Sequence, residues 1–204
     1  MTTPHAVVRA AVARCLVHPD DDLRAGLGLL RAALDERPGP GAGRVRAFLD
    51  HVEATDPGRL RQEYVRTFDF TGRRCLYLTW WTDGDTRRRG RSLVRFKEIY
   101  REHGWEYADA EELPDFLPAV CEFSALTGSD TLLRDHRPAL ELLRFALIEA
   151  DSPWAHLLEA LVATLPGASP RDRAAAQAMA RSGPPREDVG LAPYGTPLLE
   201  VVTR

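Results

Sequence analysis

The stretch PALELLRFALIEADSPWAHLLEALVATL, residues 138–165, decides the fold of this chain. Residues 138–149 are apolar on nearly every side, which is typical of a helix at the centre of a core. The residues that follow repeat apolar side chains at helical spacing, namely Trp154, Leu157, Leu158, Leu161, Val162 and Leu165. The stretch therefore predicts one helix that is buried on all sides, followed by one that is amphipathic.

The same helical period governs the rest of the chain. Apolar residues spaced by three and four predict further helices over residues 8–16, 23–34, 45–52 and 57–68. Asp85 is expected to cap a long helix that runs to about His103, and Pro114 to begin another that ends near Leu126. An Ala-rich helix is expected over residues 171–181.

One short run, Leu76-Tyr77-Leu78-Thr79-Trp80-Trp81, has the composition of a β-strand. The sequence holds no second run of this kind, and an isolated strand leaves its backbone groups unpaired. We therefore expect a short buried helix here. Together these segments predict an all-α fold, a single compact domain of about eight to ten helices over residues 1–168. Residues 169–204 are expected to form a C-terminal helix and a flexible tail, since Pro and Gly recur from Gly183 onward.

Composition excludes several classes of protein. The chain has 204 residues, of which 44% are hydrophobic, and a net charge of −3. No apolar run approaches the about 18–20 residues that span a bilayer, and the N-terminus lacks the features of a secretory signal. Cys15, Cys75 and Cys121 are far apart, which favours a reducing cytoplasm over a disulfide scaffold. We expect a cytoplasmic protein that does not insert into the membrane.

Spacings that would carry catalysis or metal binding do not occur in the sequence. The cysteines and histidines are scattered, and no nucleophile elbow, phosphate loop or dinucleotide fingerprint is present. A Ser-His-Asp set could still assemble in space. From the sequence we predict no catalytic, metal-binding or stably cofactor-binding residue.

Two features could serve either structure or binding. Trp80 and Trp81 fill the core or anchor a ligand, and neighbours on a helix point about 100° apart, so at least one should reach a boundary or groove. Charge is also segregated: residues 87–101 hold seven basic residues, whereas residues 105–130 hold seven acidic ones and no Arg or Lys. Either the two faces pair with each other, or the acidic segment attracts a basic ligand. An Arg run can also bind nucleic acid, but this chain is acidic overall.

The run Glu112-Leu113-Pro114-Asp115-Phe116-Leu117-Pro118 places Asp115 at the expected start of a helix. There a carboxylate is stabilised by the helix dipole. Asp115 is therefore either an N-terminal cap or a fixed carboxylate at the edge of a cleft.

Two blocks in this order carry a family resemblance. Gly84-Asp85-Thr86-Arg87-Arg88-Arg89-Gly90 and the run from Glu112 to Pro118, with motif positions Asp85, Arg87, Arg89, Gly90 and Pro114, resemble the nitrate reductase assembly chaperones. These form the NarJ group of the wider TorD/DmsD-like family, which is all-helical. The resemblance covers about residues 5–165. Where many relatives carry His after the Pro-Asp pair, this chain has Phe116.

The resemblance implies a function. Such chaperones bind the short, basic N-terminal segment of the apo catalytic (alpha) subunit of nitrate reductase and support molybdenum-cofactor insertion before membrane docking. The cofactor belongs to the client, and we expect a monomer or weak dimer that binds no nucleic acid. The candidate peptide-binding residues are Phe70, Tyr77, Trp80, Trp81, Asp115, Leu117 and Glu122. The alternatives are a helical adaptor for another client, a cryptic enzyme and an Arg-rich nucleic-acid-binding protein.

Overall fold

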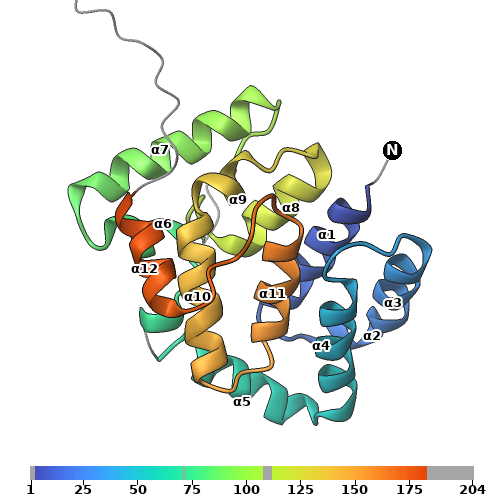
Figure 1. Ribbon diagram of the computed structural model, residues 1–204. Helices are drawn as coiled ribbons and strands as arrows, with labels where there is room; N and C mark the ends of the chain where they lie inside the picture. Colours follow the sequence, from blue (N-terminus) through green and yellow to red (C-terminus); the bar gives the residue numbers. More distant parts are fainter. Residues whose placement is uncertain (1–2, 71, 108–111, 183–204) are drawn as a thin grey trace, which may run out of the picture.

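The structure, a computed structural model of the chain, describes residues 3–70, 72–107 and 112–182. These residues form twelve α-helices and one 3-10 turn, and no named strand (Figure 1). The elements are α1 (Pro4–Leu16), α2 (Asp21–Ala25), α3 (Leu27–Glu36), α4 (Ala42–Ala54), α5 (Pro57–Phe68), η1 (Gly72–Arg74), α6 (Leu78–Asp83), α7 (Arg87–Glu102), α8 (Leu117–Thr127), α9 (Thr131–Asp135), α10 (Arg137–Glu149), α11 (Ala155–Ala163) and α12 (Arg173–Ser182). The predicted all-α class is confirmed.

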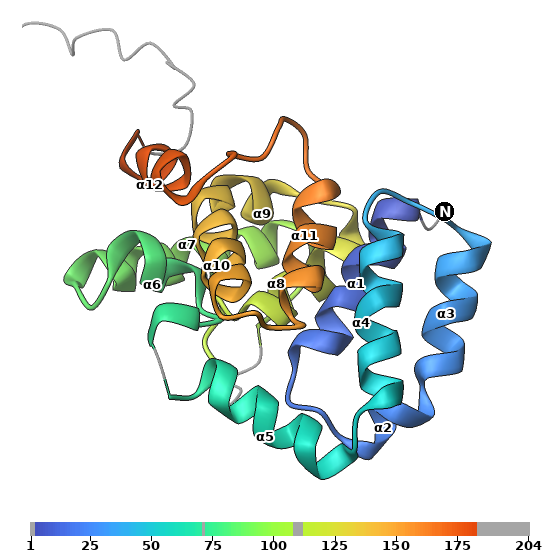
Figure 2. The same ribbon diagram turned by 60° about the horizontal axis from the view of Figure 1, so that its bottom comes forward.

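The two helices predicted from residues 138–165 lie at the centre. α10 and α11 pack side by side, α4 packs on α11, and α6 and α12 pack on α10 (Figures 1 and 2). Trp154, which precedes α11, is fully buried. Its ring lies 5.5 Å from that of Phe48 and 5.7 Å from those of Tyr64 and Phe68. This aromatic cluster joins α4 and α5 to the central pair.

Three details of the helices differ from the prediction. The helix expected over residues 23–34 is divided into α2 and α3 at Gly26, whose N–H donates to the carbonyl oxygen of Asp22 at 2.9 Å. Thr86 rather than Asp85 caps α7, and its hydroxyl accepts from the N–H of Arg88. In addition, α9 follows Asp130, where no separate helix is predicted from the sequence.

The segment before α8 corrects another expectation. Residues 76–78 do find a partner: Tyr77 and Phe116 form an antiparallel β-bridge. The N–H of Leu117 donates to the carbonyl oxygen of Leu76 at 2.8 Å, and the N–H of Leu78 donates to that of Asp115 at 3.0 Å. Helix α8 therefore begins at Leu117 rather than at Pro114, and α6 begins only at Leu78, as a short helix.

A buried arginine joins the first helix to the end of the domain. Arg9 on α1 is 4% exposed, and its guanidinium donates to the Thr164 hydroxyl at 3.1 Å, the Thr164 carbonyl oxygen at 3.0 Å and the Ser124 hydroxyl at 3.0 Å. Because all its partners are neutral oxygens, Arg9 acts as a fixed set of donors that holds α1, α8 and the end of α11 together.

The C-terminal helix α12 packs against α10 and pairs with it through Arg173 and Glu149. The Arg144 guanidinium also donates to the carbonyl oxygen of Pro170, at 3.2 Å. The tail expected from Gly183 onward lies outside the described residues.

Candidate functional site

The two sequence blocks meet in space through three side chains. One oxygen of the Asp115 carboxylate accepts from the backbone N–H of Thr79 at 2.9 Å and from its hydroxyl at 2.5 Å. The same hydroxyl accepts from Nε of Arg89 at 3.1 Å. The block that contains Arg89 and the block that contains Asp115 are thus joined by Thr79 at the start of α6.

This geometry corrects the expected position of Asp115. The residue is fully buried, so it is not a carboxylate at the edge of a cleft. It lies before α8 rather than in its first turn, and it satisfies the N-terminal N–H of another helix, α6. Its second carboxylate oxygen is buried without a hydrogen-bond partner among the described residues. Asp115 therefore acts here as a positioning residue that fixes α6 against the segment before α8.

The tryptophan pair divides as helical geometry predicts. Trp81 is half-buried against the core, and its indole N–H donates to the carbonyl oxygen of Cys75 at 2.9 Å. Trp80 is 37% exposed, and its indole N–H donates to the carbonyl oxygen of Gly72 at 3.1 Å. The Arg89 guanidinium carbon lies 5.9 Å from the centre of the Trp80 ring and 5.8 Å from that of Tyr77, within the range of cation–π attraction.

We call the three joined residues Thr79, Arg89 and Asp115 the motif unit. An apolar groove lies next to it. It has a volume of about 450 Å³, and we call it the α1–α8 groove. Its lining comes from α1 and its C-cap, from the segment before α8, and from α8: Ala10, Ala13, Arg14, Val17, Tyr107, Glu112, Phe116, Pro118, Ala119, Glu122, Ala125 and Leu126. Leu126 is 61% exposed although its neighbours are apolar. An exposed leucine within an apolar hollow is typical of a binding surface.

Two tyrosines, Tyr77 and Tyr107, hold one wall of this groove. The Tyr77 ring lies 5.5 Å from that of Phe116, and its hydroxyl donates to the Glu112 carboxylate. Burial, the hydrogen bond to Glu112 and the Glu112 charge raise the pKa of the Tyr77 phenol, so it stays a donor. Tyr107 donates to the carbonyl oxygen of Leu113 at 3.0 Å. Tyr77 therefore positions the side chains of Phe116 and Glu112, and Tyr107 positions the backbone between them.

A second, smaller hollow of about 180 Å³ adjoins the groove and shares Tyr107, Ala119, Glu122 and Leu126 with it. It adds Trp105, which is 46% exposed, and Glu106. Three carboxylates, those of Glu106, Glu112 and Glu122, thus border a continuous apolar surface. The one arginine in the groove lining, Arg14, pairs with Asp20. The surface is suited to a ligand that is apolar on one side and basic at its edges.

The structure brings only some of the predicted site residues to this surface. Glu122 lines both hollows, and Tyr77 contacts the groove wall. Leu117, by contrast, is fully buried in the core, so it is not a surface anchor. Phe70 is 76% exposed but does not line the groove, and neither Trp80 nor Trp81 lines it. Of the motif positions, Pro114 is buried, Arg89 is half-buried, and Asp85, Arg87 and Gly90 are exposed.

Sequence reasoning missed Tyr107, Phe116 and Leu126 in this surface. Leu126 occupies an apolar position on a predicted helix, which gives no sign that it faces solvent. In the sequence, Phe116 stands out only as a departure from the family pattern. Among the described residues, Arg88 of α7 pairs with Asp83, and Arg95 pairs with Glu98 and Glu102.

The described residues contain neither a cluster of metal ligands nor a helix that could span a membrane. Within residues 3–70, 72–107 and 112–182 there is no group of three or more His, Cys, Asp or Glu that could hold a metal ion. No helix in the same ranges is both long and apolar enough to span a bilayer.

Known structures and sequences identify the class of this fold. A crystal structure named as a redox enzyme maturation protein, from Archaeoglobus fulgidus, superposes with a TM-score of 0.59 and 21% identity over 76% of this chain and 90% of that one. The likeness shows that the two chains share a fold.

Sequence similarity then gives the family. Residues 20–160 match the family model described as "Nitrate reductase delta subunit". The Bacillus subtilis protein NarJ, named as a nitrate reductase molybdenum cofactor assembly chaperone, is 31% identical over 171 residues, 80% of this chain and 91% of NarJ. NarX of Mycobacterium tuberculosis, named as a nitrate reductase-like protein, is 39% identical over 142 residues, but the matched part covers only 22% of NarX. The chain belongs to the nitrate reductase delta subunit family, so the resemblance predicted from the two motif blocks is confirmed.

Proposed function

We propose that this chain is a cytoplasmic chaperone that binds the N-terminal segment of the apo catalytic subunit of nitrate reductase in the α1–α8 groove. It holds the client in a state that can accept the molybdenum cofactor, which remains the client's own. It catalyses no reaction itself and works as a monomer or weak dimer. The observation that carries this proposal is an apolar groove bordered by carboxylates in a member of this family.

The chemistry of the groove supports a basic, amphipathic ligand. An amphipathic helix places its apolar face into such a groove at residues spaced by three and four. Here Phe116, Leu126 and the α1 alanines supply the apolar contact. Glu112 and Glu122 supply acceptors for arginine at the edge, where charge-assisted hydrogen bonds form.

The test is a titration of the full chain with a labelled peptide of the client's first about 15–20 residues, the length of a short bound helix. We expect Leu126→Ser to weaken binding about 10-fold, since it removes an apolar contact. Glu122→Gln should weaken it about threefold, and this loss should shrink as salt rises. The matched controls are Leu29→Ser, at a 76% exposed leucine of α3, and Glu36→Gln, at the 76% exposed side chain that ends α3; neither should change affinity.

Different failures have different meanings. If the peptide binds but all four variants keep wild-type affinity, the groove is the wrong surface and the chaperone role stands. If the full client is retained equally well after its N-terminal segment is deleted, the binding mode is wrong. If the client is not retained at all and another protein is captured instead, the chain is an adaptor for a different partner.

A further inference from the structure

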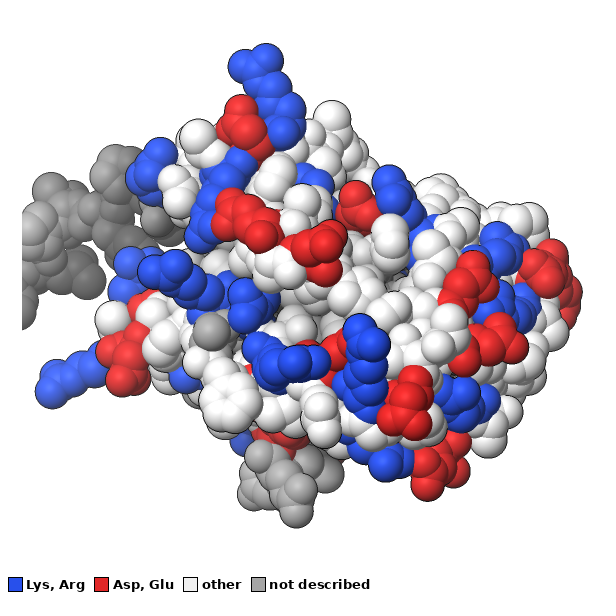
Figure 3. All heavy atoms as spheres, turned by 90° about the horizontal axis from the view of Figure 1, so that it is seen from below, with Lys and Arg blue, Asp and Glu red and all other residues white. Residues whose placement is uncertain are grey.

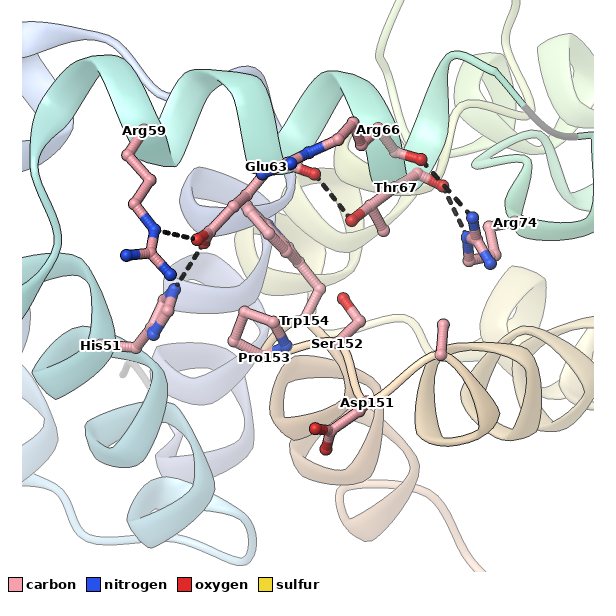
Figure 4. Close-up of a pocket in the computed structure, with 11 residues that line it drawn as sticks. His51, Arg59, Glu63, Arg66, Thr67, Arg74, Asp151, Ser152, Pro153 and Trp154 are labelled. Atoms are coloured by element: carbon pink, nitrogen blue, oxygen red, sulfur yellow. Dashed lines mark hydrogen bonds and ion pairs between the residues drawn. The ribbon is translucent and has the colours of Figure 1, made fainter.

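Another cavity lies between α5 and the loop that joins α10 to α11 (Figure 4). Its volume is about 430 Å³, within the range of small-ligand sites. We call it the α5 cavity. Its lining comes from the end of α4, from α5, from Arg74 and from residues 150–154 of the loop.

Most of the charged side chains in the lining are cationic. One of the two carboxylates, that of Glu63, already pairs with two of them. Glu63 accepts from Nε of Arg59 at 2.9 Å and contacts Nε2 of His51 at 3.0 Å (Figure 4). The other carboxylate, that of Asp151, points away from α5. Neither acid therefore neutralises the two remaining arginines of the lining.

Those two arginines are Arg66 and Arg74. Within the described ranges, neither guanidinium forms an ion pair with a carboxylate. Arg74 is held in place by the end of α5, because its Nε donates to the carbonyl oxygen of Thr67 at 2.7 Å. A guanidinium that is fixed by backbone carbonyls keeps further N–H donors for a ligand. Arg66 is exposed at the cavity wall.

A buried hydroxyl completes the donor set. Ser152 is 9% exposed, and its Oγ has no hydrogen-bond partner among the described residues. Figure 4 shows this oxygen pointing from the loop toward α5, on the side where Thr67 and Arg74 lie. A buried hydroxyl without a partner loses free energy, so its presence at a cavity lined by arginines indicates a missing acceptor.

We propose that the α5 cavity binds a compact oxyanion of the phosphate class, either inorganic phosphate or the phosphoryl group of a small phosphoester. Arg74 supplies forked donors that match phosphate oxygens, the Ser152 hydroxyl donates from the opposite wall, and Arg66 in the same lining adds positive charge. Figure 3, which views the molecule from the side on which α5 lies, shows basic and acidic side chains interspersed over this face. The selectivity must therefore come from the cavity lining rather than from a broad basic surface. This site is independent of the α1–α8 groove.

The experiment is calorimetric titration of the full chain with inorganic phosphate, glucose 6-phosphate and succinate, at about 0.15 M salt, where long-range attraction is screened. We expect saturable binding of at least one of the two phosphate compounds and none of succinate. Tighter binding of inorganic phosphate would identify a free-anion site, and tighter binding of glucose 6-phosphate a phosphoester site.

Variants locate the binding in the cavity. Arg66→Ala should weaken it at least about 10-fold and Ser152→Ala about fivefold. Arg91→Ala removes the same charge from an exposed position on α7 and should change nothing. The proposal is overturned if neither phosphate compound binds, if succinate binds equally well, or if Arg91→Ala weakens binding as much as Arg66→Ala does.

Discussion

The α1–α8 groove is walled by alanines, aromatic rings and an exposed leucine with carboxylates at its edge, whereas the α5 cavity is walled by guanidinium groups and a buried hydroxyl. Both are close to the same size, about 450 and 430 Å³. They also differ in how their walls are held. Glu112 and Phe116 of the second motif block line the groove and contact Tyr77, but no residue of either block lines the α5 cavity.

This difference shows how one small helical domain can carry two unlike surfaces. The chemistry of each hollow depends on the side chains that are not used in packing the core. Trp154, a member of the aromatic cluster, is at the same time a lining residue of the α5 cavity. Variants that damage one hollow and spare the other therefore test whether the two are separate.

The largest effect is expected at Trp154. Its ring is fully buried and forms part of the α5 cavity lining, so Trp154→Ala should lower the free energy of unfolding by about 3–5 kcal/mol. Urea unfolding measures this change. Trp105→Ala is the matched control, because that ring is 46% exposed beside the groove, and it should cost no more than about 0.5 kcal/mol. Equal costs for the two variants would contradict the packing described here.

A smaller effect is expected at the motif unit. Asp115→Ala leaves the Thr79 N–H and hydroxyl without their acceptor, which should cost about 2–3 kcal/mol of stability. Asp115→Asn should cost less, since an amide oxygen still accepts. Asp85→Ala, at the exposed aspartate of the other block, is the control and should be nearly neutral.

The same Asp115 variants distinguish the two hollows. Once folded, they should lose peptide affinity, because the groove wall loses its support, while phosphate binding in the α5 cavity stays unchanged. Parallel loss of both activities would mean that the hollows are coupled.

The smallest effect concerns pH and the α5 cavity. Burial raises the pKa of Glu63, but the hydrogen bonds from Arg59 and His51 outweigh it, so the pKa is lowered overall. A carboxylate with a lowered folded pKa stabilises the fold above its unfolded pKa of about 4.3, and this contribution is lost as pH falls through the folded value. Glu63→Gln should remove that loss, which we expect to be below about 1 kcal/mol. Urea unfolding between about pH 3 and pH 6 measures it, with Glu36→Gln as the control; an unchanged pH profile in Glu63→Gln would contradict the role of this ion pair.

Much of the fold could be predicted because apolar spacing reports directly on buried helix faces. The apolar spacing of residues 138–165 predicts α10 and α11, and that of residues 57–68 predicts α5. The break at Gly26 was not predicted, since a glycine within an apolar period does not by itself end a helix. The bridge between Tyr77 and Phe116 was not predicted either, because one pair of residues produces no periodic signal.

The candidate sites were harder to predict for the same physical reason. The sequence predicts Asp115 either as the cap of the helix that follows it or as a carboxylate at the edge of a cleft, yet it is buried and accepts from α6, far away in the sequence. The α5 cavity joins the ends of α4 and α5 with a loop about 80 residues later, and only tertiary packing brings Arg66 and Ser152 together. Local sequence patterns do not predict that residues so far apart in the chain line the same cavity.

Arg9 has a consequence for synthesis of the chain. Among the described residues, its guanidinium donates to Ser124 on α8 and to Thr164, which lies 155 positions later. At about 5–20 residues per second, the ribosome adds that segment roughly 8–30 s after Arg9 has been made. The donor set of Arg9 is therefore completed only after Thr164 has been made, and until then this contact cannot hold α1 against α8 and the end of α11.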